Sequence, residues 1–334
     1  MRLVTYLSVD GESRVGLYNL NEERTVCDLE AGAAALGIEL PSDMTELLTI
    51  DEGLEVTRNI APRLTSFPSL AVAQVTLLAA VPFPGKILAL AGNFQSHIQE
   101  GGGAAVDKDK ITPRVFMKPG TSVIGTEEAI VLPRWSDTVD YELELSIVIG
   151  SECKYVDVDD APDYIAGYMV SNDVSARTLN IAEGRDERPM DDFFDWLNGK
   201  WFDTFGAFGP YLVTADEVGD PHNLNMAFKV NGETRQQGST SQMIFDCYET
   251  VSFCSYLTTL EPGDIIATGT NHGGLNPFHD GDVVELECEG LGRLKINIRD
   301  DLKRTWERTT RLARMKKGLE PPHAPQLTGK YAPE

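Results

Sequence analysis

The chain has 334 residues, 42% of them apolar, and a formal net charge of −23. A chain of this length and composition can bury a large core, so a globular protein with two or more structural units is expected. A surface of this charge repels phosphate backbones and anionic lipids, which argues against nucleic-acid and membrane partners. We find no cleavable signal pattern and no apolar run near the ~18 residues of a membrane span, so the expected location is cytoplasmic.

Cysteine usage argues against two further kinds of structure. The five cysteines stand at 27, 153, 247, 254 and 288, without CxxC spacing and mostly within apolar stretches. Neither a disulfide framework nor a zinc site is therefore predicted.

The first 83 residues are predicted to form an accessory domain. Its expected elements are strands over 3–7 and 14–20 and helices near 30–37 and 43–49. The sequence Pro82-Phe83-Pro84-Gly85 then interrupts any regular element, and an apolar, strand-like run follows immediately. We place a domain boundary between 83 and 84. No catalytic constellation is found in 1–83, so its expected role is packing and assembly.

Short apolar runs dominate from residue 84 onward. The predicted strands cover 144–149, 164–171, 208–213, 265–268, 283–288 and 293–298. Turn-forming residues separate several runs, as in Pro262-Gly263-Asp264, Asp280-Gly281-Asp282 and Gly290-Leu291-Gly292. This pattern favours antiparallel hairpins over βαβ units, so 84–300 is predicted to be mainly β within an α+β fold class.

The residues after 300 are predicted to form a helix and a tail. Apolar residues from Leu302 to Met315 follow a helical period, with two aspartates before them and two lysines after them. Gly318 is the expected stop. The segment 301–334 is therefore interpreted as a C-terminal helix followed by an extended, proline-rich arm.

An alternating acidic run stands between Val139 and Ile149. Apolar residues occupy the odd positions, whereas Asp140, Glu142 and Glu144 occupy even ones. In a strand, Glu142 and Glu144 would project side by side with their roots ~7 Å apart. Two such carboxylates can converge on a hard cation such as Mg²⁺, Mn²⁺ or Ca²⁺. The alternative is an amphipathic strand with a solvated acidic face.

A third carboxylate follows a buried element. The apolar run 164–170 reads as a core strand, and it ends in Ser171-Asn172-Asp173. A charge at the exit of a core strand needs a partner, which would suit a metal ligand. Asp173 could equally cap a helix beginning at Val174. The spacing leaves both interpretations open.

Several ordered motifs together resemble the fumarylacetoacetate hydrolase superfamily, in its acylpyruvase and 2-hydroxyhepta-2,4-diene-1,7-dioate isomerase-like branch. The motifs are VDYELEL (139–145), SNDVSAR (171–177), GK-WFDTF-GP (199–210), NGETRQQGSTSQMIF (231–245), LEPGDIIATGT (260–270) and DGDVVELECEGLGRL (280–294). The match covers roughly residues 84–298. The segment 1–83 resembles the variable N-terminal domain of longer members.

The resemblance implies a fold and a metal centre. The expected fold is a mixed β-roll or β-sandwich catalytic domain with a smaller α+β N-terminal domain, assembled as a homodimer. The implied metal ligands are Glu142, Glu144 and Asp173, with Mg²⁺ or Mn²⁺ as the cofactor and Ca²⁺ as a further candidate. The family lysine that faces substrate and metal corresponds to Lys200, whose charge would stabilise an enolate oxygen.

The segment from Gly92 to Glu100 resembles the family lid motif G-x-N-Y-x-x-H-x-x-E. On a helical turn, Glu100 could orient His97 and raise its basicity, so that the imidazole activates water. The resemblance also implies substrate contacts, for which we list Asn93, Phe94, Lys118, Arg177, Gln236 and Thr270.

Two features depart from the family pattern. Gly92 stands where many members carry a basic residue, and His272 follows Thr270 and Asn271 where the family usually has Gly-Thr-Pro. The sequence assigns His272 no role. The stretch 181–197 is longer than the corresponding connection in minimal members, and it either shapes substrate selectivity or decorates the surface.

These observations predict a metal-dependent hydrolase that cleaves a carbon–carbon bond of a small 2,4-dioxo acid to pyruvate and a carboxylic acid. Decarboxylation or isomerisation of a 2-oxo dioate is the alternative, because it also passes through an enolate but needs no attacking water. A non-catalytic, metal-stabilised binding protein is a third hypothesis, since fold alone does not determine function. The His97–Glu100 pair favours hydrolysis.

Overall fold

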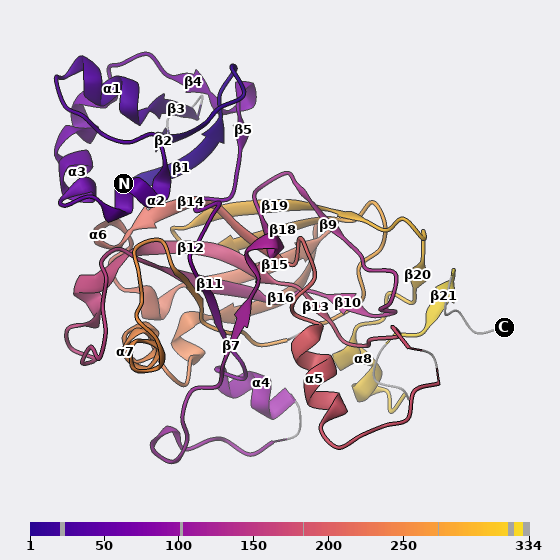
Figure 1. Ribbon diagram of the computed structural model, residues 1–334. Coiled ribbons are helices and arrows are strands. Elements are labelled where there is room, and N and C mark those ends of the chain that lie inside the picture. Colours follow the sequence, from indigo (N-terminus) through magenta and orange to yellow (C-terminus); the bar gives the residue numbers. More distant parts are fainter. Residues whose placement is uncertain (21–23, 101–102, 183, 273, 320–323, 330–334) are drawn as a thin grey trace.

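The computed structural model describes residues 1–20, 24–100, 103–182, 184–272, 274–319 and 324–329. Two large sheets organise this part of the chain, and short helices surround them (Figure 1). The predicted class, mainly β with an α+β N-terminal unit, is confirmed. None of the described helices is both long and apolar enough to cross a membrane.

The first sheet combines N-terminal strands with strands of the predicted catalytic domain. The N-terminal strands are β1 (Arg2–Leu7), β2 (Ser13–Asn19), β3 (Thr25–Asp28), β4 (Leu70–Ala71) and β5 (Thr76–Leu77). The others are β6 (Ile87–Leu90), β7 (Val115–Lys118), β8 (Val123–Ile124), β11 (Leu143–Ile149), β12 (Ile165–Asp173), β14 (Gly206–Thr214) and β17 (Ile265–Ala267). Its main path is β4-β3-β2-β1-β14-β12-β11-β17-β6-β7. The sheet therefore continues across the predicted boundary at 83/84, which stays a prediction.

The second sheet lies in the predicted catalytic domain. It consists of β9 (Ala129–Val131), β15 (Asn225–Val230), β16 (Glu233–Ser239), β18 (Val283–Cys288) and β19 (Gly292–Arg299). Their order is β16-β15-β18-β19-β9. Two small ladders complete the strands: β10 (Val139–Asp140) pairs with β13 (Ser175–Ala176), and β20 (Thr305–Trp306) pairs with β21 (Gln326–Thr328).

The helices gather at opposite ends of the molecule (Figure 1). One end carries α1 (Leu29–Ala35), α2 (Met44–Thr49) and α3 (Gly53–Leu64). The other end carries α4 (Gln95–Glu100), α5 (Asp191–Asn198) and α8 (Arg311–Lys316), while α6 (Ala215–Val218) and α7 (Cys247–Leu257) flank the sheets. Side chains of Asp28 and Asp43 accept backbone N–H bonds at the starts of α1 and α2, which stabilises both helix ends.

The central strands β11 and β12 are buried on both faces. On one face, Ile147 and Tyr168 belong to the hydrophobic cluster shared with the second sheet. On the other face, Val148 and Met169 pack in the cluster that contains residues of α1 and α2. Alternation places Glu142, Glu144 and Asp173 on this second face, further along the two strands. The acids therefore stand in a sheet that is covered on both sides.

Of the three turns predicted to form hairpins, one connects two paired antiparallel strands. Gly290 joins β18 to β19, which pair antiparallel as expected. The turn at Pro262 instead leads into β17, which pairs antiparallel with β11 but parallel with β6. The turn at Asp280 precedes β18 without linking it to the strand before. Turn-forming residues indicate only that the chain changes direction. Which strand the next one pairs with depends on contacts between distant parts of the chain.

The C-terminal helix is shorter than the periodicity predicted. Helix α8 begins at Arg311 after Thr310, whose hydroxyl caps it, and the residues before it include strand β20. The side chain of Asp300 accepts backbone N–H bonds from Leu302 and Arg304, which holds this segment in a turn. A local side-chain interaction thus competes with the helix that the apolar spacing indicated.

Replacing Arg304 by Met is expected to destabilise the fold strongly. Arg304 and Asp300 are fully buried, and the guanidinium donates two bonds to this carboxylate, at 2.9 and 3.0 Å, and one to the carbonyl of Pro133 at 3.0 Å. Arg304→Met leaves the Asp300 charge buried without its partner, which should lower the free energy of unfolding by ~3–5 kcal/mol in urea denaturation.

The neighbouring Lys303 provides the matched control. Its ion pair with Asp280, at 2.6 Å, lies at the surface, where the Lys303 side chain is 68% exposed. Lys303→Met should therefore change the free energy of unfolding by less than ~1 kcal/mol. Equal losses in the two variants would contradict a structural role for the buried pair.

Candidate active site

The register of two strands brings three carboxylates together. Glu144 of β11 pairs with Ser171 of β12, and the Asp173 N–H donates to the Glu142 carbonyl at 2.9 Å. Because alternate side chains share a face, Glu142, Glu144 and Asp173 project from the same side of the sheet. One carboxylate oxygen from each lies within 4.8 Å of the others. The convergence predicted from the sequence is confirmed.

Two alternatives from the sequence are wrong. All residues of β11 are buried, and Glu142, Glu144 and Asp173 are exposed by only 6%, 1% and 4%, so the acids do not form a solvated face. Asp173 is the last residue of β12 and is followed by strand β13, so it caps no helix at Val174. The β-ladder continues past Asp173 because Val174 donates its N–H to the carbonyl of Phe205.

The pKa values of the two glutamates shift in opposite directions, because burial acts on both in the same way but the charges near them differ. Burial, followed by the charges of Asp173 and Glu142, raises the pKa of Glu144 well above its ordinary value. Burial also opposes the charge of Glu142, but Lys200, Arg177 and His272 outweigh it and hold the pKa of Glu142 well below its ordinary value. Glu144 is therefore the carboxylate that most needs a positive charge.

Three cations surround the acids: Lys118 and Lys200 are buried, and Arg177 is partly buried. The Lys200 Nζ donates to Glu142 at 2.7 Å and to Asp173 at 2.6 Å. The Lys118 Nζ donates to the other oxygen of Asp173 at 2.7 Å, and Arg177 donates to Glu142 at 2.6 Å. Burial disfavours the charge of Lys200, yet Asp173 and Glu142 raise its pKa above the ordinary value. These pairs make the acids rigid and leave Lys200 facing the site.

The charge balance of this buried group suits a divalent cation. Four carboxylates face three cations, namely Asp140, Glu142, Glu144 and Asp173 against Lys118, Arg177 and Lys200. Within the described ranges Glu144 forms no ion pair; one of its oxygens accepts the Gly269 N–H at 2.7 Å. A compact set of carboxylate oxygens is the donor set that Mg²⁺ and Mn²⁺ prefer. The residues present therefore fit the predicted metal.

The predicted lid pair meets a third residue. His97 and His272 lie edge to face with ring centroids 3.9 Å apart, and Glu100 accepts the backbone N–H of His272 at 2.9 Å. His272 also contacts Glu142, with 2.9 Å between Nε2 and Oε1. Burial lowers the pKa of His97 and lowers that of His272 to about 3, so both imidazoles are neutral at pH 7. A neutral imidazole can accept a proton.

A cavity of about 820 Å³ opens beside the carboxylates. Of the predicted site residues, its lining includes Glu142, Glu144, His97, Lys200, Arg177 and Thr270. Glu100 lies in a small adjoining pocket together with His97 and His272. The structure thus brings the predicted metal ligands, lysine and lid pair to one place. Their catalytic roles stay predictions.

Four predicted substrate contacts lie behind the cavity lining and hold it in place. The Asn93 side chain bonds the backbone of Phe245 and Thr268, and Phe94 is fully buried. Lys118 pairs with Asp173 as described above. The Gln236 side chain donates to the Thr270 hydroxyl at 2.6 Å and accepts the Leu143 N–H at 3.1 Å, so it links the loop of Thr270 to β11. The geometry of these four supports positioning roles.

Sequence reasoning missed two parts of the site. It gave His272 no role, although this residue contacts both Glu142 and Glu100 of the lid segment. The departure from the family's Gly-Thr-Pro was the only sequence signal that pointed to His272. It also left open the stretch 181–197, whose helix α5 supplies Phe193, Trp196 and Leu197 to the cavity. The helical spacing of Phe193, Trp196 and Leu197 was the available signal for a helix with one apolar face.

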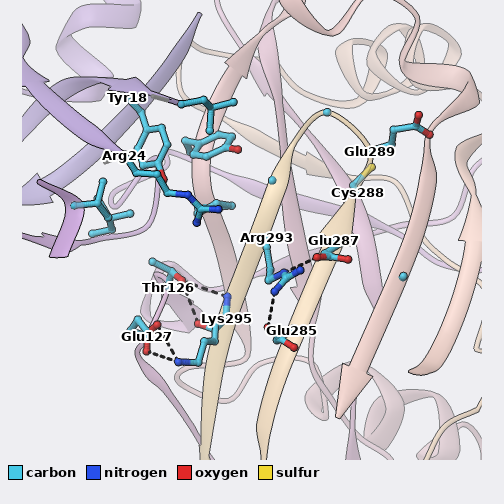
Figure 2. Close-up of a pocket in the computed structure, with 18 of the residues that line it drawn as sticks. Tyr18, Arg24, Thr126, Glu127, Glu285, Glu287, Cys288, Glu289, Arg293 and Lys295 are labelled. Carbon is cyan, nitrogen blue, oxygen red and sulfur yellow. Dashed lines mark hydrogen bonds and ion pairs between the residues drawn. The ribbon is translucent and has the colours of Figure 1, made fainter. Parts of the chain in front are cut away.

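A second cavity, of about 1350 Å³, lies elsewhere, between the N-terminal unit and the second sheet. Figure 2 shows Tyr18 and Arg24 on one side and residues of β18 and β19 on the other. Its charged side chains pair with each other, as in Arg293 with Glu285 at 3.1 Å and Lys295 with Glu127 at 3.1 Å. Among the residues that the structure describes, none of the acids around this cavity converge as a group, so the smaller cavity is the better candidate site.

Glu144→Gln is expected to abolish tight binding of Mn²⁺. The variant removes the carboxylate without an ion pair and also relieves its repulsion from Asp173 and Glu142. Mn²⁺ at a hundredfold excess over its dissociation constant should stabilise the unmodified protein by ~2.7 kcal/mol and leave the variant unchanged. Calorimetric titration and thermal unfolding with Mn²⁺ measure both effects. Glu285→Gln, in the second cavity, is the control, and Mn²⁺ binding by Glu144→Gln with unchanged affinity would contradict the assignment.

Comparisons with known proteins agree with this geometry. The chain is 40% identical over 261 residues to the oxaloacetate tautomerase FAHD2A, mitochondrial, of Bos taurus, covering 76% of this chain and 78% of that protein. The structure of maleylpyruvate hydrolase from Sphingobium sp. SYK-6 in complex with manganese (II) ion and pyruvate superposes with a TM-score of 0.70 at 29% identity, covering 90% of this chain and 99% of that one.

Another solved structure has a similar fold and a different reaction in its name. The 2-hydroxyhepta-2,4-diene-1,7-dioate isomerase from Mycobacterium marinum superposes with a TM-score of 0.67 at 29% identity, again over 90% of this chain and 99% of that one. The family model described as fumarylacetoacetate (FAA) hydrolase C-terminal matches residues 86–299. The named relatives are enzymes of the hydrolase, isomerase and tautomerase kinds. The chain belongs to the fumarylacetoacetate hydrolase family.

Proposed function

We propose that the protein is a divalent-metal-dependent hydrolase that cleaves a carbon–carbon bond of a 2,4-dioxo acid and releases pyruvate and a carboxylic acid. One observation carries this proposal. A single cavity is lined by two of the three converging carboxylates, by the Lys200 ammonium and by the neutral His97 imidazole. These groups can serve as metal ligands, stabiliser of negative charge and proton acceptor, which are the parts that this reaction requires.

The charged groups would prepare the substrate. Held by Glu142, Glu144 and Asp173, Mg²⁺ or Mn²⁺ would supply Lewis-acid polarisation of the 2-oxo group. Lys200 keeps its ammonium at a defined point because two carboxylates bind it, at 2.7 and 2.6 Å. From there it can offset negative charge that develops on the substrate oxygen, and the burial of the Lys200 side chain strengthens this interaction.

The lid residues would supply the attacking water. His97 takes a proton from water, and the hydroxide adds to the carbonyl carbon at position 4. The bond between carbons 3 and 4 then breaks, its electron pair forms the enolate of pyruvate, and protonation at carbon 3 gives pyruvate. One carboxylate oxygen of Glu100 lies within 4.8 Å of a His97 ring nitrogen, and Glu100 is anchored on the His272 N–H, so its charge can stabilise the charged form of His97.

The comparisons support both this proposal and one alternative. The maleylpyruvate hydrolase structure, with manganese and pyruvate, supports hydrolysis. The 40% identity to an oxaloacetate tautomerase favours a second candidate, in which the substrate is enolised without bond cleavage. The pair of neutral imidazoles, His97 and His272, could pass a proton in such a reaction. The aromatic side chains of Phe116, Phe193 and Trp196 in the cavity lining favour a substrate with an acyl group, which supports hydrolysis.

His97→Gln is expected to stop cleavage while leaving metal binding intact. Loss of a general base lowers kcat by ~10²–10⁴-fold. The measurement uses Mn²⁺-loaded enzyme with acetylpyruvate, fumarylpyruvate and oxaloacetate, following loss of the enol absorbance and release of pyruvate. Mn²⁺ affinity, measured separately, should match that of the unmodified protein.

The control for this experiment is His222→Gln, because His222 lies outside both cavities. Cleavage of acylpyruvates that survives in His97→Gln would refute the role of His97. If no acylpyruvate is cleaved and oxaloacetate only changes tautomer, without pyruvate release, the tautomerase alternative is correct and the hydrolase proposal is not.

A further inference from the structure

We infer that the substrate carries an apolar, ring-sized acyl group, which packs on an aromatic wall formed by Phe116, Phe193, Trp196 and Trp201. All four side chains line the cavity that holds the candidate metal ligands. This inference rests on the proposed function, because it names the class of 2,4-dioxo acid that the site would cleave.

The wall begins where the charged cluster ends. The Lys200 Nζ, bonded to Glu142 and Asp173, lies 5.3 Å from the Phe116 ring centroid and 5.9 Å from that of Trp196. The Phe116 and Trp196 rings meet edge to face, with centroids 5.2 Å apart. A substrate held at Lys200 therefore lies directly beside aromatic surface.

Part of the aromatic wall is exposed to solvent. Phe193 and Trp201 are each 47% exposed, although both face the cavity. Phe193 and Trp196 project from α5 with ring centroids 5.9 Å apart, so the helix presents them as one surface. Contiguous apolar surface at a cavity is removed from water when an apolar ligand group binds there. The volume of about 820 Å³ also suits a ligand much larger than a four-carbon acid.

The cations of the cavity point to a substrate with a single carboxylate. Lys200 and Arg177 are already paired with carboxylates of the protein. A second carboxylate, at the far end, would meet aromatic rings. Of the residues that line the cavity, Arg114 is the cation outside the paired cluster, and it is exposed.

Binding of substrate-like acids tests the wall directly. The Mn²⁺-loaded protein is titrated with pyruvate, phenylpyruvate and oxaloacetate, and binding is followed by tryptophan fluorescence and by calorimetry. We expect phenylpyruvate to bind at least about tenfold more tightly than pyruvate and to quench the fluorescence of Trp196, because burying a phenyl group has an effect of this size. Trp196→Ala and Phe193→Ala should each remove most of this gain. Trp135→Phe, outside the cavity, is the matched control.

Turnover separates the inference from the proposed function. We expect benzoylpyruvate to exceed acetylpyruvate in kcat/KM by about tenfold or more, with the ratio falling toward one in Trp196→Ala. Acetylpyruvate cleaved as well as benzoylpyruvate would overturn the aromatic wall but leave the hydrolase. Tight phenylpyruvate binding without cleavage of any acylpyruvate would leave the wall but overturn the hydrolase. A preference for fumarylpyruvate that is lost in Arg114→Gln would assign the far end to a carboxylate and overturn the inference.

Discussion

The burial of three like charges at one end of β11 and β12 is the constraint on which the site depends. Carboxylates within 4.8 Å of one another repel strongly once water is removed, and the protein meets this repulsion with buried ammonium and guanidinium groups and a backbone N–H. These partners come from four separate segments, so the surrounding loops are held in place by charge. Burying these charges costs folding free energy. The two hydrophobic clusters on the two faces of the same strands offset this cost.

Local patterns predicted the parts of the site that depend on one strand alone. The alternation between Val139 and Ile149 indicated that Glu142 and Glu144 share a face, because side chains alternate in any strand. The pairing of Glu144 with Ser171 depends on contacts between distant segments, so the position of Asp173 stayed open until the register was known. The resemblance to a family supplied that information for the metal ligands.

The remaining features could not be predicted because each is decided by packing. The parallel pairing of β17 with β6 joins segments far apart in the chain, and no turn between them reveals it. His272 gains its place from Glu142, which lies 130 residues earlier in the sequence. The helix after residue 300 was predicted too long, because Asp300 satisfies the backbone of Leu302 and Arg304 in a turn.

The pairing of β1 with β14 gives the N-terminal unit a protective role. Beside β14 runs β12, the strand that carries Asp173, so β14 without β1 would present unpaired N–H and C=O groups close to the centre of the sheet. Exposed edges of this kind recruit strands from other molecules and lead to aggregation. The N-terminal unit therefore covers this edge of β14, and such a cover requires no catalytic residue in the first 83 positions.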